Sequence, residues 1–148
     1  MVYIIGAGPG DPELITVKGQ RLLKEADVII YAGSLVNPAL LDYAKADCEI
    51  YNSASMTLGE VIETITAAEQ EGKMTVRLHT GDPAIYGAIQ EQMDELSRRN
   101  IEYTVIPGVS SFLATAAALK QEYTLPEISQ TVIITRNEGR TPVPEKEK

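Results

Sequence analysis

Short apolar segments alternate with amphipathic segments along most of the chain. Five runs of β-branched and aliphatic residues have the length and spacing of strands, and they lie at 2–5, 27–31, 48–51, 74–78 and 102–106. The segments between them have apolar positions at helical spacing and predict helices at about 16–26, 37–44, 57–71, 84–99 and 110–120. Strands separated by helices pair in parallel through right-handed crossovers, so the pattern predicts an open, mainly parallel five-stranded α/β sheet flanked by helices.

Local signals mark several helix boundaries. Asn37 precedes Pro38, which predicts an N-cap followed by the first helical residue. Thr57 and Glu60 have the spacing of a capping box, and Gly72 ends the same predicted helix. In the helix predicted at 16–26, the side chains expected to face the core are Val17, Leu22 and Leu23.

The pattern changes after residue 120. Another β-type run lies at 131–135, whereas 139–148 is rich in proline and charge and has no apolar face. We therefore expect an N-terminal α/β domain over 1–120. Residues 121–148 are expected to be the incomplete start of a second α/β domain, made of a linker, one strand and a charged tail.

Composition and charge narrow the class of protein. The chain has 148 residues, of which 44% are hydrophobic, and a formal net charge of −8. Such a negative surface repels phosphate backbones and anionic lipid, so we expect neither nucleic acid nor membrane as a partner. Cys48 is the only cysteine and cannot form an internal disulfide. Residues 1–5 lack the features of a signal peptide, so a cytoplasmic location is expected.

A glycine-rich loop, Gly6-Ala7-Gly8-Pro9-Gly10-Asp11, follows the first predicted strand. It differs from a dinucleotide fingerprint because Asp11 stands at the third glycine position and Pro9 has no N–H to offer a phosphate. The second strand also ends in Tyr31-Ala32-Gly33, without the carboxylate that would bind a ribose. The alternative for the glycines is a tight turn that lets backbones pack closely.

Two further turns of small residues follow strands. Thr80–Gly87 contains Asp82, and Pro107–Ser111 contains two serines. Capping of the next helix is the structural alternative for Asp82 and for the serines. Because the carboxyl ends of parallel strands share one edge, we expect the three turns to form one pocket with hydroxyls, two aspartates and little positive charge. That pocket suits S-adenosylmethionine, which carries a sulfonium and an ammonium group, better than a polyphosphate.

The same three turns resemble the signatures of the tetrapyrrole methylase family. The first is Tyr3–Thr16, the second is Gly81-Asp82-Pro83 with Tyr86-Gly87, and the third is Ile106–Ser111, in the family's order and spacing. Within the family, 31–36 and 52–57 are most similar to the enzymes that methylate carbon C11 of precorrin-4 or cobalt-precorrin-4. The resemblance implies an enzyme that transfers methyl groups from S-adenosylmethionine to a corrin-precursor tetrapyrrole, and a homodimer.

The resemblance also implies where the ligands bind. The donor-binding positions that match the family's motifs are Pro9, Thr80, Gly81, Asp82, Ile85, Ser110 and Ser111. Tyr86 is expected to cover the donor. The residues expected to line the acceptor site, because they follow the second and third strands, are Ser34, Asn52, Ser55 and Met56. No catalytic residue and no metal-ligand set is predicted, and His79, the only histidine, is interpreted as structural because no carboxylate partner can be identified for it.

Other interpretations stay open at this point. Family members are longer than this chain, so a donor site built between two domains would be half open, and the chain would then be a non-catalytic donor-binding or dimerisation module. Another family branch acting on RNA or on a protein is a second alternative, and a nicotinamide oxidoreductase a third. The sequence leaves open whether the acceptor already contains cobalt.

Overall fold

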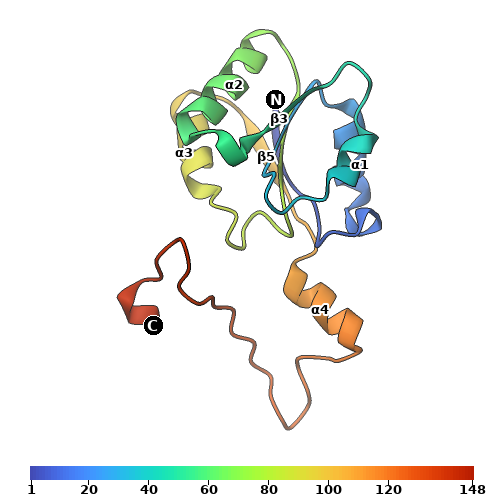
Figure 1. Cartoon of the computed structure of the whole chain (residues 1–148), viewed down its shortest axis with the longest axis vertical. Helices are drawn as coiled ribbons and strands as arrows, with labels where there is room; N and C mark the ends of the chain where they lie inside the picture. Colours follow the sequence, from blue (N-terminus) through green and yellow to red (C-terminus); the bar gives the residue numbers. More distant parts are fainter. The chain divides into compact units, whose positions relative to one another are not determined.

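A computed structural model describes residues 1–148 and contains a five-stranded sheet in which every neighbouring pair is parallel (Figure 1). The sheet order is β3-β2-β4-β1-β5. The strands are β1 Val2–Gly6, β2 Val28–Tyr31, β3 Glu49–Asn52, β4 Thr75–His79 and β5 Tyr103–Ile106. The open α/β architecture predicted by the alternating pattern is therefore confirmed, and the sheet is wholly parallel.

Helices cover both faces of this sheet. The α-helices are α1 Val17–Glu25, α2 Leu58–Gln70, α3 Gln90–Arg98 and α4 Ser111–Leu119. The 3₁₀ turns are η1 Pro12–Leu14, η2 Pro38–Tyr43, η3 Ser53–Ser55 and η4 Glu145–Glu147. In Figure 1, α2 and α3 lie together on one side of the strands and α1 lies on the other. None of the helices is both long and apolar enough to cross a lipid bilayer.

The period-two alternation of the strands separates two apolar layers. On β2, Ile29 packs with α1, whereas Val28 and Ile30 pack with α2 and α3. Leu23 of α1 and Leu96 of α3 are fully buried in their respective layers. Burial on both faces explains why β1 and β2 read as nearly continuous apolar runs.

The local capping signals operate as predicted. The Thr57 hydroxyl accepts from the N–H of Glu60, whose carboxylate accepts from the N–H of Thr57, which completes the capping box. Asn37 caps η2 by accepting from the N–H of Ala39 at 3.0 Å. These bonds supply acceptors to amide groups that a helix N-terminus leaves unpaired.

The expectation that Val17 faces the core is wrong, because its side chain is 84% exposed. The buried positions of α1 are Gly19, Leu22 and Leu23. These recur at i, i+3 and i+4 and so share one stripe of the helix. Val17 lies two residues before Gly19, on the opposite side of the same turn.

The helix predicted at 84–99 is also shorter than expected, since α3 begins only at Gln90. Tyr86 (φ 56°) and Ala88 (φ 52°) have left-handed backbones, which a right-handed helix cannot include. Between them, the backbone of Gly87 packs so closely on Pro83 that an added Cβ would lie 2.0 Å from the Pro83 carbonyl oxygen. Residues 84–89 therefore form an irregular loop at the end of β4.

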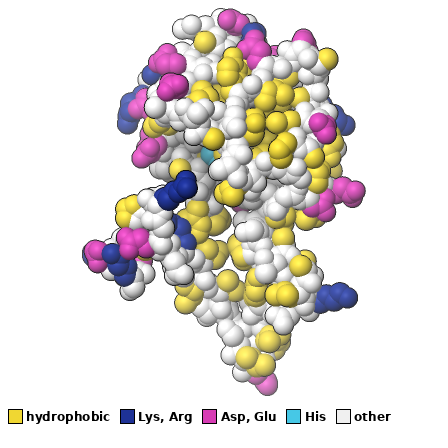
Figure 2. Space-filling view, viewed as in Figure 1, with side chains coloured by type: hydrophobic (Ala, Val, Ile, Leu, Met, Phe, Trp, Pro, Cys, Tyr) yellow, Lys and Arg dark blue, Asp and Glu magenta, His cyan; other side chains and the backbone are white.

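The chain divides into two compact units, an N-terminal unit of Met1–Ala114 and a C-terminal unit of Thr115–Lys148. In the space-filling view, acidic side chains are scattered around the N-terminal unit among fewer basic ones (Figure 2). In the C-terminal unit, the β-type run at 131–135 does not form a strand. The run has no neighbouring strand to pair with, and Ile133 is 82% exposed.

Candidate functional site

The loops that follow β1 and β4 are joined at the carboxyl edge of the sheet. The N–H of Gly8 donates to the carbonyl oxygen of Gly81 (3.2 Å), and the N–H of Gly81 donates to the carbonyl oxygen of Gly8 (2.8 Å). The N–H of Ala7 donates to the carbonyl oxygen of His79 at 2.6 Å. This is the edge at which open α/β sheets bind their ligands.

Glycine is required where these loops meet the loop after β5. A Cβ on Gly6 would lie 2.6 Å from the Gly81 oxygen and 2.7 Å from the Gly108 Cα. A Cβ on Gly108 would lie 2.2 Å from the same Gly81 oxygen. The three turns thus pack backbone against backbone, and the close-packing role of these glycines is evident in the structure.

Asp82 connects two of the turns through its carboxylate. Its Oδ1 accepts from the N–H of Ala84 (2.8 Å), and its Oδ2 accepts from the N–H of Gly108 (2.9 Å). The helix-capping alternative for Asp82 is wrong, because α3 begins eight residues later, at Gln90. With both oxygens bonded to backbone groups, Asp82 fixes the positions of the two turns relative to each other.

The first turn is also fixed by side chains. Asp11 accepts from the N–H of Glu13 (2.9 Å) and caps η1. The Asn37 side chain donates to the carbonyl oxygen of Gly10 at 2.7 Å, which joins the turn to the loop after β2. Pro9, which precedes Gly10, is half-buried.

Two hydroxyls near the junction make no hydrogen bond within the protein. Ser110 is 7% exposed, and Thr80 is half-buried. Neither hydroxyl has a protein partner, so both are available to a ligand. Ile85 and Tyr86 are exposed on the loop that follows Thr80, and Ser111 begins α4.

A cavity of about 290 Å³ lies between the ends of β2 and β4 and the irregular loop at 84–89. It brings together part of the predicted donor set, namely Thr80, Ile85 and Tyr86, with Ser34 of the predicted acceptor set. Polar side chains from the sheet form another part of its lining, and these are Arg77, His79 and Gln92.

The other predicted acceptor residues line a different and more open cavity of about 760 Å³. Asn52, Ser55 and Met56 lie there beside the first turns of α2. Asn52 also has a structural role, because its Oδ1 accepts from the N–H of Ala54 (2.9 Å) and its side chain fills the space beside Gly33. Ser34 and the other three candidates therefore line different cavities.

A buried polar network lies beneath the smaller cavity. Arg77 donates from Nε to Gln92 Oε1 (3.0 Å) and from one terminal nitrogen to the carbonyl oxygen of Ile30 (3.1 Å). The Gln92 amide nitrogen donates to the carbonyl oxygen of Ala88 (3.2 Å) and lies 3.4 Å from His79 Nε2. Since the Gln92 oxygen already accepts from Arg77, its nitrogen donates to His79, which assigns the ring proton of His79 to Nδ1.

Burial and the neighbouring guanidinium keep His79 uncharged. Burial, together with the positive charge of Arg77, lowers the pKa of His79 to about 3. Burial lowers the pKa of Arg77 to about 10, so the guanidinium stays charged at neutral pH. Arg77 is not among the site residues predicted from sequence, although an arginine between Val76 and Leu78 in a predicted strand is the signal that marks it.

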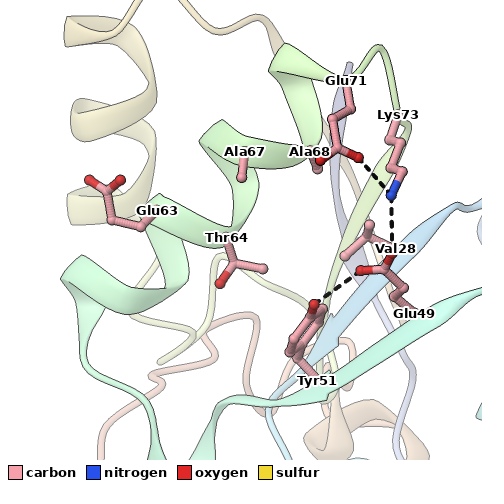
Figure 3. Close-up of a pocket in the computed structure, with 9 residues that line it drawn as sticks. All are labelled: Val28, Glu49, Tyr51, Glu63, Thr64, Ala67, Ala68, Glu71 and Lys73. Carbon is pink, nitrogen blue, oxygen red and sulfur yellow. Dashed lines mark hydrogen bonds and ion pairs between the residues drawn. The ribbon is translucent and has the colours of Figure 1, made fainter.

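A third cavity, of about 390 Å³, lies between α2 and β3 (Figure 3). Lys73 forms ion pairs there with Glu49 (3.0 Å) and Glu71 (2.8 Å), and the Tyr51 hydroxyl donates to Glu49 (3.0 Å). These carboxylates raise the pKa of Lys73. The charged side chains of this cavity pair with one another near the amino ends of the strands, away from the glycine turns. We therefore interpret the cavity as part of the structural framework and not as a ligand site.

Comparison with known proteins places the chain in a family. All 148 residues match the family described as tetrapyrrole (corrin/porphyrin) methylases. The cobalt-precorrin-4 C(11)-methyltransferase of Methanocaldococcus jannaschii is 67% identical over 147 residues, which are 99% of this chain and 57% of that protein. The chain thus spans little more than half the length of this relative.

Solved structures show the same relationship. An X-ray structure of cobalt precorrin-4 methyltransferase, a cobalamin biosynthetic enzyme, superposes with a TM-score of 0.95 at 56% identity, covering 99% of this chain and 62% of the other. The uroporphyrin-III C-methyltransferase of Thermus thermophilus, in complex with S-adenosylhomocysteine, has a TM-score of 0.67 at 38% identity and covers 78% of this chain and 47% of the other. The glycine turns, the parallel sheet and these relatives together show that the chain belongs to the tetrapyrrole methylase family.

Proposed function

We propose that this chain is the N-terminal part of an S-adenosylmethionine-dependent methyltransferase that methylates carbon C11 of precorrin-4 or cobalt-precorrin-4. The observation that carries the proposal is the junction of the three turns through Gly8, Gly81 and the Asp82–Gly108 hydrogen bond. The 67% identity of this chain to a cobalt-precorrin-4 C(11)-methyltransferase supports the assignment to this branch of the family.

The residues at the junction fit the donor. The free hydroxyls of Thr80 and Ser110 offer hydrogen bonds to the polar groups of S-adenosylmethionine. The proposed donor-binding residues are Pro9, Thr80, Gly81, Asp82, Ile85, Tyr86, Ser110 and Ser111. Among these, Asp82 acts by holding the turns in place, because both of its oxygens are already bonded to backbone N–H groups.

The chemistry requires alignment more than acid–base assistance. The bound donor supplies an electrophilic methyl group on a good leaving group, and the electron-rich ring carbon of the acceptor is the nucleophile. The chain's contribution is to orient both partners and exclude water. Neutral His79, buried under the cavity, has no proton-transfer role in this proposal. Ser34, Asn52, Ser55 and Met56 are proposed to line the acceptor's path.

The rest of the site is proposed to lie outside this chain. The curated relative is longer, and residues 121–148 are proposed to correspond to the start of its second domain. We also propose a homodimer, for which the exposed residues of the edge strand β3 offer an unpaired side. If the second domain completes the donor site, this chain by itself carries only part of that site and has no catalytic activity.

Calorimetric titration of S-adenosylhomocysteine tests the proposal. The ligand is added to this chain and to a version extended through the second domain, with Lys73→Met as a control variant that leaves the turns intact. We expect clear binding by the extended protein and weak or no binding by the short chain. Equal, tight binding by both would contradict the divided site, and no binding by either would contradict the proposed donor.

A further inference from the structure

Arg77 is a buried cation without an acidic partner. Its residue is 6% exposed, and it projects from the middle of β4. None of the ion pairs in the structure includes it. A buried charge is costly unless it is paired, so an unpaired guanidinium in a chain of net charge −8 requires an explanation.

The donors of Arg77 are only partly used inside the protein. A guanidinium has five N–H groups, and the protein accepts from Nε through Gln92 and from one terminal nitrogen through Ile30. The second terminal nitrogen has no acceptor. This nitrogen is not fully buried, since the only fully buried side-chain polar atom without a hydrogen-bond partner is Thr75 Oγ1. The free donors are therefore open to the 290 Å³ cavity that Arg77 lines.

The cavity around these donors suits a small anion. Ser34 and Thr80 contribute hydroxyls, His79 is neutral, and no carboxylate side chain lines the space. The bonds to Gln92 and Ile30 fix the guanidinium plane, so the remaining N–H groups are presented as a rigid fork. A planar carboxylate matches such a fork through two parallel hydrogen bonds.

We propose that Arg77 anchors a carboxylate of the bound ligand at this cavity. This inference rests on the proposed function, whose two ligands both carry carboxylates. One source is an acetate or propionate side chain of the tetrapyrrole acceptor, and the other is the amino-acid carboxylate of the methyl donor. Both sources share the same recognition chemistry, and the experiment separates them.

The first test probes the site without any reaction. Acetate and propionate are titrated into this chain while the arginine Nε–H resonances are followed by NMR, with chloride at matched ionic strength as the control. The Arg77 signal is assigned as the one that disappears in Arg77→Lys. We expect a saturable shift of that signal with carboxylate and none with chloride. Equal shifts with both salts, or no shift with carboxylate, would overturn the proposal.

The second test identifies the source of the carboxylate in the extended protein. Arg77→Lys keeps the positive charge but loses the planar guanidinium, and Arg77→Gln removes both the charge and the guanidinium. Arg98→Gln, which alters an exposed arginine of α3, is the matched control. Circular dichroism and thermal unfolding identify folded variants, and Arg77→Lys serves if Arg77→Gln fails to fold. Affinity for S-adenosylhomocysteine and KM for the tetrapyrrole are then measured.

The outcomes separate the possibilities. A KM for the tetrapyrrole raised about tenfold or more, with unchanged affinity for S-adenosylhomocysteine, assigns the carboxylate to the acceptor. Affinity for S-adenosylhomocysteine lowered about tenfold or more, with an unchanged KM, assigns it to the donor. No change in either, in folded Arg77→Lys and Arg77→Gln, would make Arg77 a framework residue and overturn the inference. If the wild-type protein methylates no precorrin-4 yet keeps the acetate-dependent shift, the proposed function fails while the carboxylate site stands.

Discussion

The carboxylate of Asp82 accepts a hydrogen bond from the backbone N–H of Gly108, at 2.9 Å and across 26 residues of sequence. This bond, together with the Gly8–Gly81 pairing, joins loops from three strands into one junction. Between the three turns, Asp82 supplies the side-chain contact, whereas the Gly8–Gly81 contacts are between backbone atoms. The function proposed for the chain therefore depends on Asp82 in a way that can be measured.

Asp82→Asn is expected to weaken both the fold and donor binding. An amide has one acceptor oxygen, so only one of the two N–H groups, of Ala84 or Gly108, keeps its partner. The loss is expected to be about 1–3 kcal/mol of unfolding free energy, measured by denaturant titration, with weaker S-adenosylhomocysteine binding in the extended protein. Asp11→Asn is the matched control, since it caps η1 without joining two turns. Equal effects of the two substitutions on ligand binding would contradict the joining role.

Gly108→Ala is expected to destabilise the chain by a few kcal/mol or to prevent folding. The new Cβ would lie 2.2 Å from the carbonyl oxygen of Gly81, and the backbone has no room to retreat because Gly6 lies on the same side. Gly139→Ala, where an added Cβ meets nothing within 4 Å, is the control. The unfolding free energies of both variants check the prediction, and a Gly108→Ala variant as stable as the control would disprove the close packing.

Ser110→Ala is expected to leave stability within about 0.5 kcal/mol of wild type while lowering affinity for S-adenosylhomocysteine. The hydroxyl is buried at the junction but makes no hydrogen bond within the protein, so its removal costs the fold little. In Ser53→Ala, by contrast, a hydrogen bond to the carbonyl oxygen of Tyr31 (3.2 Å) is lost at a residue outside the proposed donor set. The control should keep full ligand affinity, and unchanged affinity in Ser110→Ala would remove Ser110 from the donor site.

His79 is expected to make the N-terminal unit less stable as the solution is acidified. Its pKa falls from an ordinary 6.5 to about 3 in the folded state, so the unfolded chain binds a proton that the folded chain excludes. The associated stability is fully present above pH 6.5 and is lost progressively as the pH falls toward 3, by up to about 1.4 kcal/mol per pH unit. Denaturant unfolding between pH 7 and 5 measures this slope, and His79→Gln should flatten it. An unchanged slope in that variant would show that other groups take up the proton.

Much of the framework follows from local sequence. The strands β1 and β2 are recognised because they are apolar on both faces, and the start of α2 because Thr57 and Glu60 form a capping box within four residues. The glycine turns are recognisable as a set because each follows a strand. Errors arose where local pattern was incomplete. Val17 is apolar but lies off the buried stripe of α1, and 84–89 has helical composition but a left-handed backbone at Tyr86 and Ala88.

By itself, the sequence determined the order of elements, the parallel sheet and the family, because caps, periodicity and short motifs depend on neighbouring residues. The tertiary structure alone decided which distant groups meet. It paired Asp82 with Gly108 and placed Ser34 and Asn52 at different cavities. It also left Arg77 with unused hydrogen-bond donors that face a cavity. The physical reason is that hydrogen-bond partners and burial are set by packing between elements far apart in the chain, which no local pattern encodes.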